Sequence, residues 1–204
     1  MHKQKIWDFY ADWYEKLWVQ KYVLEPSRNL IVENIDYLAT SFRILDVGCG
    51  IGQLCADLNK AFPNAEIVGI DPSEKMIERA RKINYNKNIK YITGFAENIL
   101  FEEKFDVIVS TNAFPYVLDK TYFLEKIKKT LNPNGKLLLL FANRNTLYDF
   151  LILLIVKLTT SKADYLSVNS TSKLLQQCGY KIKNIKRINS IKLIPSVYMF
   201  ESFK

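Results

Sequence analysis

Histidine and cysteine are scarce in this chain of 204 residues. The single histidine, His2, stands near the amino terminus, where order is least expected. The three cysteines, Cys49, Cys55 and Cys178, do not suggest a disulfide framework, and no cysteine and histidine cluster has the spacing of metal ligands. These absences argue against an internal histidine base and against zinc-activated chemistry, so we expect no metal.

Recognisable targeting and spanning segments are also missing. The apolar run at residues 150–156 is far shorter than the roughly 20 residues that a membrane-spanning helix needs. The chain begins with polar and aromatic residues rather than a signal peptide, which predicts a cytoplasmic location. No repeat, low-complexity tract or linker divides the sequence, and its length fits a single domain, 1–204.

The net charge of +8 raises the question of a nucleic-acid partner. Five basic residues gather near the C-terminus, where they alternate with apolar residues as on a half-exposed strand: Lys181, Lys183, Lys186, Arg187 and Lys192. Charge runs of this kind usually keep a protein in solution, so we favour a solvated face and argue against nucleic acid as the partner.

The most informative stretch is residues 44–54, an apolar strand pattern followed by an acid and closely spaced glycines. Glycines at this spacing let the backbone approach a ligand that a Cβ would push away. A dinucleotide-binding loop would place its third glycine at position 53, which is Gln53 here. The pattern therefore favours a different ligand.

With these residues the sequence resembles the class I S-adenosylmethionine (SAM)-dependent methyltransferases, whose first motif is an acid followed by G-x-G-x-G. The resemblance implies that SAM is the cosubstrate. It also implies that a carboxylate at the mouth of the loop faces a ligand that carries an ammonium and a sulfonium. The residues carried over as SAM-binding are Asp46, Gly48, Cys49, Gly50 and Gly52.

The next strand pattern, residues 66–70, ends in Asp71, about 20 residues past the glycines. A carboxylate accepts two hydroxyl donors at once, so Asp71 is predicted to hold the ribose. Ser73 is a natural N-cap for the following helix. The resemblance implies that Pro72 and Met76 border the adenine, although Met76 fits a plain core position equally well.

Two later segments extend the resemblance. Residues 89–97 match the third strand of the family and the segment after it that meets the adenine amino group. The resemblance implies that Ala96 and Glu97 contact the adenine. The alternative for Glu97 is a solvated turn residue. Residues 105–109 read as a buried strand, and the resemblance places Ser110 and Asn112 at its end, beside the methyl group.

The loop after this strand does not carry the N-P-P-Y motif of methyltransferases that modify nucleobases or glutamine. Ala113 and Phe114 stand where the two prolines belong. This departure argues against an adenine or glutamine modifier.

Alternating strand and helix patterns with short connections predict a parallel sheet with helices on both faces. One of the helices begins at Asp119, and another is capped by Ser170 and ends at Gly179. We expect an α/β, Rossmann-like, doubly wound fold with a mostly parallel seven-stranded sheet and an antiparallel last strand. The expected divisions are a helical lid, a SAM-binding core, a helical insert and closing strands, at residues 1–40, 43–142, 143–179 and 180–204.

The N-terminal segment is rich in aromatic residues on two faces of one candidate helix, which can pack on the domain with one side and cover a ligand with the other. These residues are Trp7, Phe9, Tyr10, Trp13, Tyr14 and Trp18. The alternative is an aromatic packing helix. Tyr10, Tyr14 and Tyr116 are candidate contacts near the methyl group, and no residue is identified as a general base.

The apolar run at 150–156 is expected to form a buried helix in the insert. The alternatives are a wall for an apolar acceptor, a dimer face, or shallow contact with a membrane surface. The sequence as a whole predicts methyl transfer from SAM to a small, apolar, lipid-like or quinone-like acceptor by in-line displacement. A non-catalytic SAM-binding protein and an RNA methyltransferase stay open as alternatives, as does a homodimer.

Overall fold

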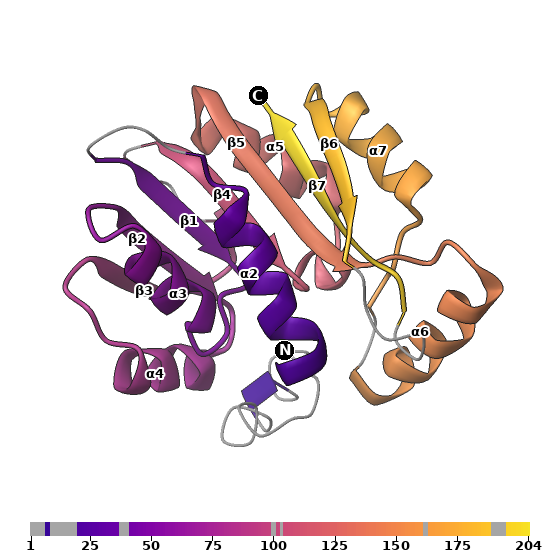
Figure 1. The fold of residues 1–204 in the computed structure, drawn as a ribbon, viewed down its shortest axis with the longest axis horizontal. Coiled ribbons are helices and arrows are strands. Elements are labelled where there is room, and N and C mark those ends of the chain that lie inside the picture. Colours follow the sequence, from indigo (N-terminus) through magenta and orange to yellow (C-terminus); the bar gives the residue numbers. More distant parts are fainter. Residues whose placement is uncertain are drawn as a thin grey trace.

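A computed structural model describes residues 7–8, 20–36, 41–98, 101–102, 104–160, 163–188 and 195–204. One seven-stranded sheet runs through the molecule in the order β3-β2-β1-β4-β5-β7-β6, with helices on both sides (Figure 1). β1 to β5 pair in parallel, and β7 is antiparallel to both β5 and β6. The predicted fold class is confirmed.

The strands are β1 (Arg43–Val47), β2 (Glu66–Asp71), β3 (Ile89–Thr93), β4 (Phe105–Thr111), β5 (Leu131–Ala142), β6 (Lys181–Arg187) and β7 (Val197–Phe203). The α-helices are α2 (Glu25–Glu33), α3 (Gln53–Ala61), α4 (Glu74–Ile83), α5 (Lys120–Thr130), α6 (Leu147–Thr160) and α7 (Val168–Gln177). Shorter helical turns are η2 (Gln20–Leu24), η3 (Ala96–Asn98) and η4 (Phe114–Tyr116).

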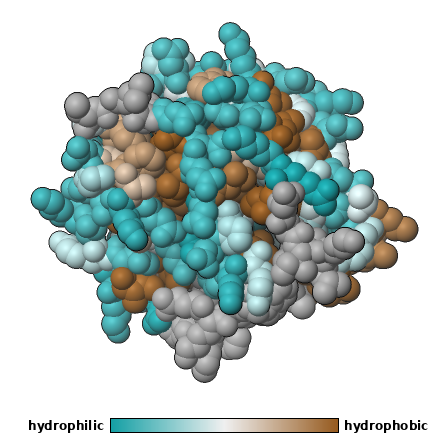
Figure 2. All heavy atoms as spheres, in the orientation of Figure 1, coloured by the Kyte–Doolittle hydropathy of each residue, from teal (hydrophilic) through white to brown (hydrophobic). Residues whose placement is uncertain are grey.

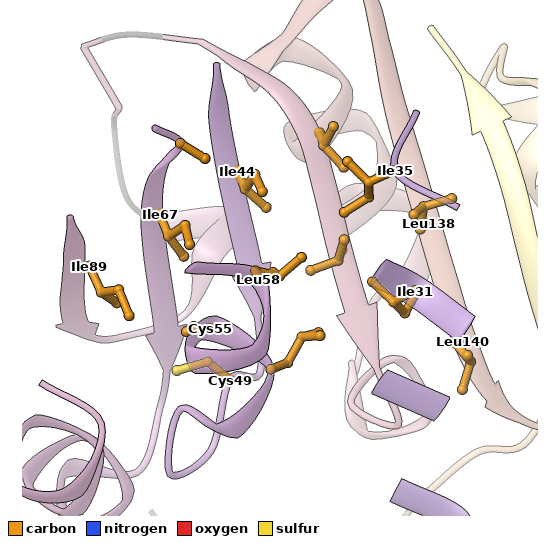
Figure 3. Close-up of a cluster of buried hydrophobic side chains, with 14 of the residues drawn as sticks. Ile31, Ile35, Ile44, Cys49, Cys55, Leu58, Ile67, Ile89, Leu138 and Leu140 are labelled. Carbon is orange, nitrogen blue, oxygen red and sulfur yellow. The ribbon is translucent and has the colours of Figure 1, made fainter. Parts of the chain in front are cut away.

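Side-chain alternation along the strands builds a separate apolar core on each face of the sheet. On one face, Ile44 of β1 and Ile67 of β2 lie in a cluster with residues from α2 and α3, including Ile31 and Leu58 (Figure 3). α2 thus falls inside the segment predicted as a lid and packs on the sheet through a fully buried Ile31.

The opposite face is covered by α5 and α7. Leu45 and Ile108, each next in sequence to a residue of the first core, join Phe123 of α5 and Leu175 of α7 in the second cluster. Stacked rings extend this core to β7, since Phe141 and Phe200 lie with their centroids 5.8 Å apart. The two cores hold the strands rigidly, so their carboxyl ends form a fixed platform.

The predicted helix starts are partly right. Ser73 caps α4 by accepting a hydrogen bond from Met76 N, and Asp119 caps α5 by accepting one from Tyr122 N. The predicted cap at Ser170 is wrong, because α7 is capped by Ser167, whose hydroxyl accepts a bond from Ser170 N. Ser167 has the extended backbone that an N-cap needs, whereas Ser170 is already helical.

Two strand predictions also need adjustment. The Asn-Pro-Asn-Gly pattern at residues 132–135 predicts a turn, but the structure includes these residues in β5 as an irregularity. The pairing of β5 jumps from Leu131 to Lys136 while β4 advances only from Phe105 to Val107. The sequence pattern within 180–204 predicts two strands, at residues 180–189 and 194–203, and both strands of the structure are shorter than that. β6 pairs with β7 and forms an edge of the sheet among the described strands, and it exposes most of its residues, in agreement with the predicted solvated basic face.

The largest departure from prediction is α6. The expected buried helix is wrong, because most of the run at 150–156 is exposed and Leu153 is its one deeply buried residue. α6 projects from the body beyond the end of β5, at the lower right of Figure 1. A search of the described residues finds no helix long and apolar enough to cross a membrane.

Candidate functional site

The glycine loop after β1 is fastened to the end of β2. The amide N–H groups of Gly48 and Cys49 both donate to Ile70 O, at 2.8 and 3.1 Å. The N–H of Gly50 donates to Asp71 Oδ2 at 3.0 Å. Two residues carried over from separate motifs are therefore joined directly, and the loop is held in one conformation at the carboxyl edge of the sheet.

All three motif glycines have left-handed backbone, with φ of 77° at Gly48, 54° at Gly50 and 79° at Gly52. A Cβ at Gly48 would overlap the Cβ of Ala113, and one at Gly52 would overlap the hydroxyl of Tyr91. A Cβ at Gly50 would meet no atom within 4 Å. Gly48 and Gly52 are therefore required by packing, whereas the space beside Gly50 is a cradle that a side chain would fill.

Asp71 has the position expected of a ribose-binding acid. Its Oδ1 accepts a hydrogen bond from Ser73 N at 2.9 Å, so each carboxylate oxygen already has one backbone donor and keeps capacity for another. Burial raises the pKa of Asp71 to about 6, against the opposing effect of these two amide donors. The end of β3 reaches the same point, since Gly94 N donates to Asp71 O at 2.9 Å.

Asp46 lies elsewhere than expected. It was predicted at the mouth of the loop, but it is 1 % exposed within β1, and its Oδ2 accepts a bond from Cys55 Sγ at 3.3 Å. Burial raises its pKa to about 7; the hydrogen bond from the Cys55 thiol opposes this, and the nearby Asp71 adds a smaller upward effect. The strand position puts the acid beneath the loop, where it is a buried, readily protonated group.

The end of β4 carries polar side chains that the fold leaves unused. Within the described ranges, the buried atoms Ser110 Oγ, Thr111 Oγ1 and Asn112 Nδ2 make no hydrogen bond. Asn112 also has left-handed backbone, with φ of 58°. Unsatisfied buried polar atoms and strained backbone both cost stability, and they gather where a ligand supplies the missing partners.

A small aromatic cluster stands over the loop. Trp7 packs with Ile51 of the glycine loop and with Met76 of α4, apart from the two main cores. Its ring also makes an edge contact with Tyr116, with centroids 5.3 Å apart. The next residue, Asp8, accepts a hydrogen bond from Ser73 Oγ at 2.5 Å. The described part of the aromatic N-terminus thus lies on the same edge of the sheet as Gly50.

Tyr116 connects this cluster to the insert. Its hydroxyl lies 3.5 Å from that of Tyr165, and Tyr165 lines an open cavity of about 70 Å³ together with Phe150 and Leu154 of α6. The other two predicted tyrosines, Tyr10 and Tyr14, lie outside the described residues. A chain of contacts therefore runs from Trp7 through two tyrosines to α6.

The remaining predicted residues have plain surroundings. Pro72 follows β2, and Ala96 and Glu97 form η3 after β3, with Ala96 buried and Glu97 half-buried. Thr111 lies with Ser110 and Asn112 at the predicted carboxyl end of the fourth strand. No motif in the sequence points to Asp8 or Tyr165, because only tertiary contacts bring them to this edge.

The arrangement suits a nucleoside-bearing ligand better than metal or acid–base chemistry. A carboxylate for a hydroxyl pair, a backbone cradle and unpartnered polar groups lie side by side. In the part of the chain that the structure describes, no three histidine, cysteine or acidic side chains come together as metal ligands. The described groups at this edge can bind and orient a ligand, which is the contribution that alignment of two reactants needs.

Comparisons with known proteins agree with this geometry. Residues 39–191 match a family described as "Methyltransferase domain". The chain is 34% identical over 134 residues to the malonyl-[acyl-carrier protein] O-methyltransferase of Priestia megaterium, and this alignment covers 66% of this chain and 46% of that protein. It is 35% identical over 106 residues to the ubiquinone biosynthesis O-methyltransferase of Bradyrhizobium diazoefficiens, 50% of this chain and 41% of that protein. The chain thus spans less than half the length of these curated relatives.

Solved structures share the fold. A SAM-dependent methyltransferase of Thermotoga maritima superposes with a TM-score of 0.77 at 20% identity and covers all of both chains. The magnesium protoporphyrin IX methyltransferase of Synechocystis, with bound S-adenosylhomocysteine, superposes with a TM-score of 0.72 at 19% identity, covering 92% of this chain and 88% of that one.

Proposed function

The chain belongs to the class I SAM-dependent methyltransferases, and we propose that it transfers the methyl group of SAM to a small, apolar acceptor. The observation that carries the proposal is the open cradle at Gly50, hydrogen-bonded directly to the acid at the end of β2. A ligand in that cradle would lie beside Asp71, and β4, the neighbour of β1 on the other side, ends in the unpartnered polar groups.

The residues present fit SAM. Asp71 would hold the ribose hydroxyls, as each of its oxygens retains an acceptor site. Pro72 and Met76 would border the adenine beside Trp7, which packs on Met76, and η3 would offer polar groups at its edge. The left-handed loop presents backbone without side chains to the amino-acid part. Ser110 and Asn112 would supply hydrogen bonds that the described fold leaves unmade.

When bound, SAM supplies a methyl group on a sulfonium that is already a good leaving group. The task of the protein is therefore to align the acceptor with the methyl group and to exclude water, which lowers the barrier by fixing the reactants. The aromatic cluster of Trp7, Tyr116 and Tyr165 is placed for this task, because it stands between the glycine loop and α6. The predicted roles of Tyr10 and Tyr14 belong to the same proposal.

The walls of the proposed acceptor site favour an apolar molecule. Trp7 and Tyr116 form one side, and Tyr165, which meets Tyr116, also lines the small cavity beside α6 together with Phe150 and Leu154. The charged residues of that cavity, Arg144, Lys157 and Asp164, would provide the polar groups that orient a ligand held mainly by apolar contact. The two relatives named above act on malonyl-acyl-carrier protein and in ubiquinone biosynthesis, so acyl and quinone-like acceptors are the first to test.

The test is formation of S-adenosylhomocysteine from SAM with a panel of acceptors: a quinol, a medium-chain fatty acid, an acyl-carrier-protein thioester of malonate, and transfer RNA. We expect turnover with the quinol or the fatty acid and none with RNA. Turnover with RNA alone, or with the malonyl thioester alone, would contradict a small, apolar acceptor. SAM binding without turnover on any acceptor would favour the non-catalytic alternative.

Trp7→Ala separates the acceptor wall from the SAM site. Because Trp7 contacts both Ile51 and Tyr116, its loss should lower turnover at a given acceptor concentration, with a smaller effect on binding of S-adenosylhomocysteine. Tyr85→Ala is the matched control, since Tyr85 is a large aromatic residue that is 80 % exposed. An unchanged acceptor KM and kcat in Trp7→Ala would remove Trp7 from the acceptor site.

A further inference from the structure

α6 presents a continuous aliphatic stripe to solvent. Leu147, Leu151, Ile155 and Leu158 are exposed by 75, 51, 62 and 80 %. At 3.6 residues per turn these four positions, together with the exposed Leu154, lie within an arc of about 100° on one side of the helix. Figure 2 shows hydrophobic residues on the surface at the edge where Figure 1 places α6.

The fold itself does not require this stripe. α6 is attached through its opposite side, where Leu153 is buried and Asp149 Oδ1 accepts a hydrogen bond from Ser196 N at 2.8 Å. A helix whose outer face only met water would carry polar residues there. A contiguous exposed apolar patch on a soluble domain marks an interaction surface.

The charges around the stripe indicate what the surface binds. Arg144 and Lys157 line the cavity beside α6 and are both exposed. The neighbouring acids are engaged, since Asp149 accepts bonds from the backbone and Asp164 pairs with Lys120 at 3.4 Å. With Lys120 included, three cations face two acids around the stripe, so its border carries a small net positive charge, on a chain of net charge +8.

A second copy of this chain is a poor occupant. A symmetric contact through α6 would bring two such positive borders together beside a dehydrated apolar face, which is unfavourable. An anionic lipid surface matches both features, because acyl chains accept the aliphatic residues and headgroups attract the cations. The aromatic residues Tyr148 and Phe150, both exposed on the same helix, suit the boundary between the two regions.

We propose that α6 docks this protein on an anionic lipid bilayer, with the helix lying in the plane of the interface and its aliphatic stripe buried among the acyl chains. In this orientation the edge of the sheet at which β5 ends faces the bilayer. The cavity lined by α6 and Tyr165 lies at the same edge. The docking does not depend on methyl transfer, and a binding assay without SAM tests it separately.

The experiment is co-sedimentation with vesicles of phosphatidylglycerol, compared with vesicles of pure phosphatidylcholine. We expect stronger binding to phosphatidylglycerol, and weaker binding as salt is raised, since screening reduces the attraction. Leu151→Gln/Leu158→Gln removes apolar surface without changing charge or helix-forming tendency, and it should weaken binding by roughly tenfold or more. Tyr85→Gln, at an equally exposed position away from α6, should bind as the wild type.

The cations are tested by Arg144→Gln/Lys157→Gln, which should lose the preference for phosphatidylglycerol. The control variant Lys60→Gln/Lys82→Gln removes the same net charge from the ends of α3 and α4. This control should retain the preference for phosphatidylglycerol. Circular dichroism checks that each variant is folded. The proposal is overturned by absent sedimentation of the wild type, or by full binding in the α6 double variant. A wild-type dimer that becomes monomeric in that variant while vesicle binding persists would instead assign the face to self-association.

Discussion

Gly50→Ala tests whether the open space beside the glycine loop is a ligand cradle. The added Cβ meets no protein atom within 4 Å, so the fold bears only the strain of a left-handed alanine at φ 54°. That strain is about 1–2 kcal/mol. For a domain of this size each kcal/mol lowers the melting temperature by roughly 2–4 °C. The variant should fold, with a modest loss of stability.

Ligand binding should suffer more. If SAM occupies the cradle, the new methyl group stands where backbone and ligand approach each other, and the affinity should fall by more than about tenfold, or 1.4 kcal/mol. Calorimetric titration with S-adenosylhomocysteine measures this directly. An affinity equal to that of the wild type would refute the reasoning, because the space would then have no bound ligand in it.

Gly48→Ala is the matched control. It adds the same methyl group to the same loop at a similar backbone angle, but its Cβ would overlap that of Ala113. We expect this variant to lose clearly more stability than Gly50→Ala in thermal unfolding without ligand. Equal losses in the two variants would contradict the distinction between a packing glycine and a ligand-facing one.

Three carboxylates give further predictions. Asp71→Asn should weaken S-adenosylhomocysteine binding by about 1–3 kcal/mol, measured by calorimetry, because a charged acceptor for the ribose is lost; an unchanged affinity would remove its ribose role. The raised pKa of Asp46 means that this carboxyl binds a proton more tightly in the folded protein than in the unfolded chain. The free energy of unfolding without ligand should therefore fall as the pH rises from about 4 to 7. Asp46→Asn should flatten that dependence and be more stable than the wild type above pH 7. The pKa of Asp149 is lowered by its hydrogen bonds with Ser196 and Thr146, against the effect of burial. Asp149→Asn should therefore cost about 1–3 kcal/mol near neutral pH, and this difference should vanish in acid, once the wild-type carboxyl is protonated. Chemical denaturation of the wild type and of each variant across pH measures the free energies of unfolding. A stability difference between a variant and the wild type that does not change with pH would refute the prediction for that carboxylate.

The strands and the glycine loop were predictable because their signals are local. Buried parallel strands are nearly continuous apolar runs, and the acid at the end of β2 stands at a spacing set by one strand–helix–strand unit. The caps at Ser73 and Asp119 are equally local. The cap of α7 was assigned to Ser170 instead of Ser167, since two serines one turn apart carry the same signal and only backbone geometry separates them.

The rest depends on tertiary contacts that no local pattern encodes. Asp46 belongs to a recognisable motif, yet its depth follows from the packing of Cys55 above it. Tyr165 meets Tyr116 across 49 residues of chain. The run at 150–156 predicts a helix but not its burial, because an apolar helix is equally compatible with a core and with a binding surface. In α6 the structure places most of that run in solvent.

The most direct test of the account is a crystal structure of the protein with S-adenosylhomocysteine. We expect the ribose hydroxyls on Asp71, the adenine beside Pro72 and Met76, and the amino-acid part over Gly50, with hydrogen bonds to Ser110 or Asn112. A ligand bound away from this edge, or crystals that take up a nicotinamide dinucleotide and not S-adenosylhomocysteine, would contradict it.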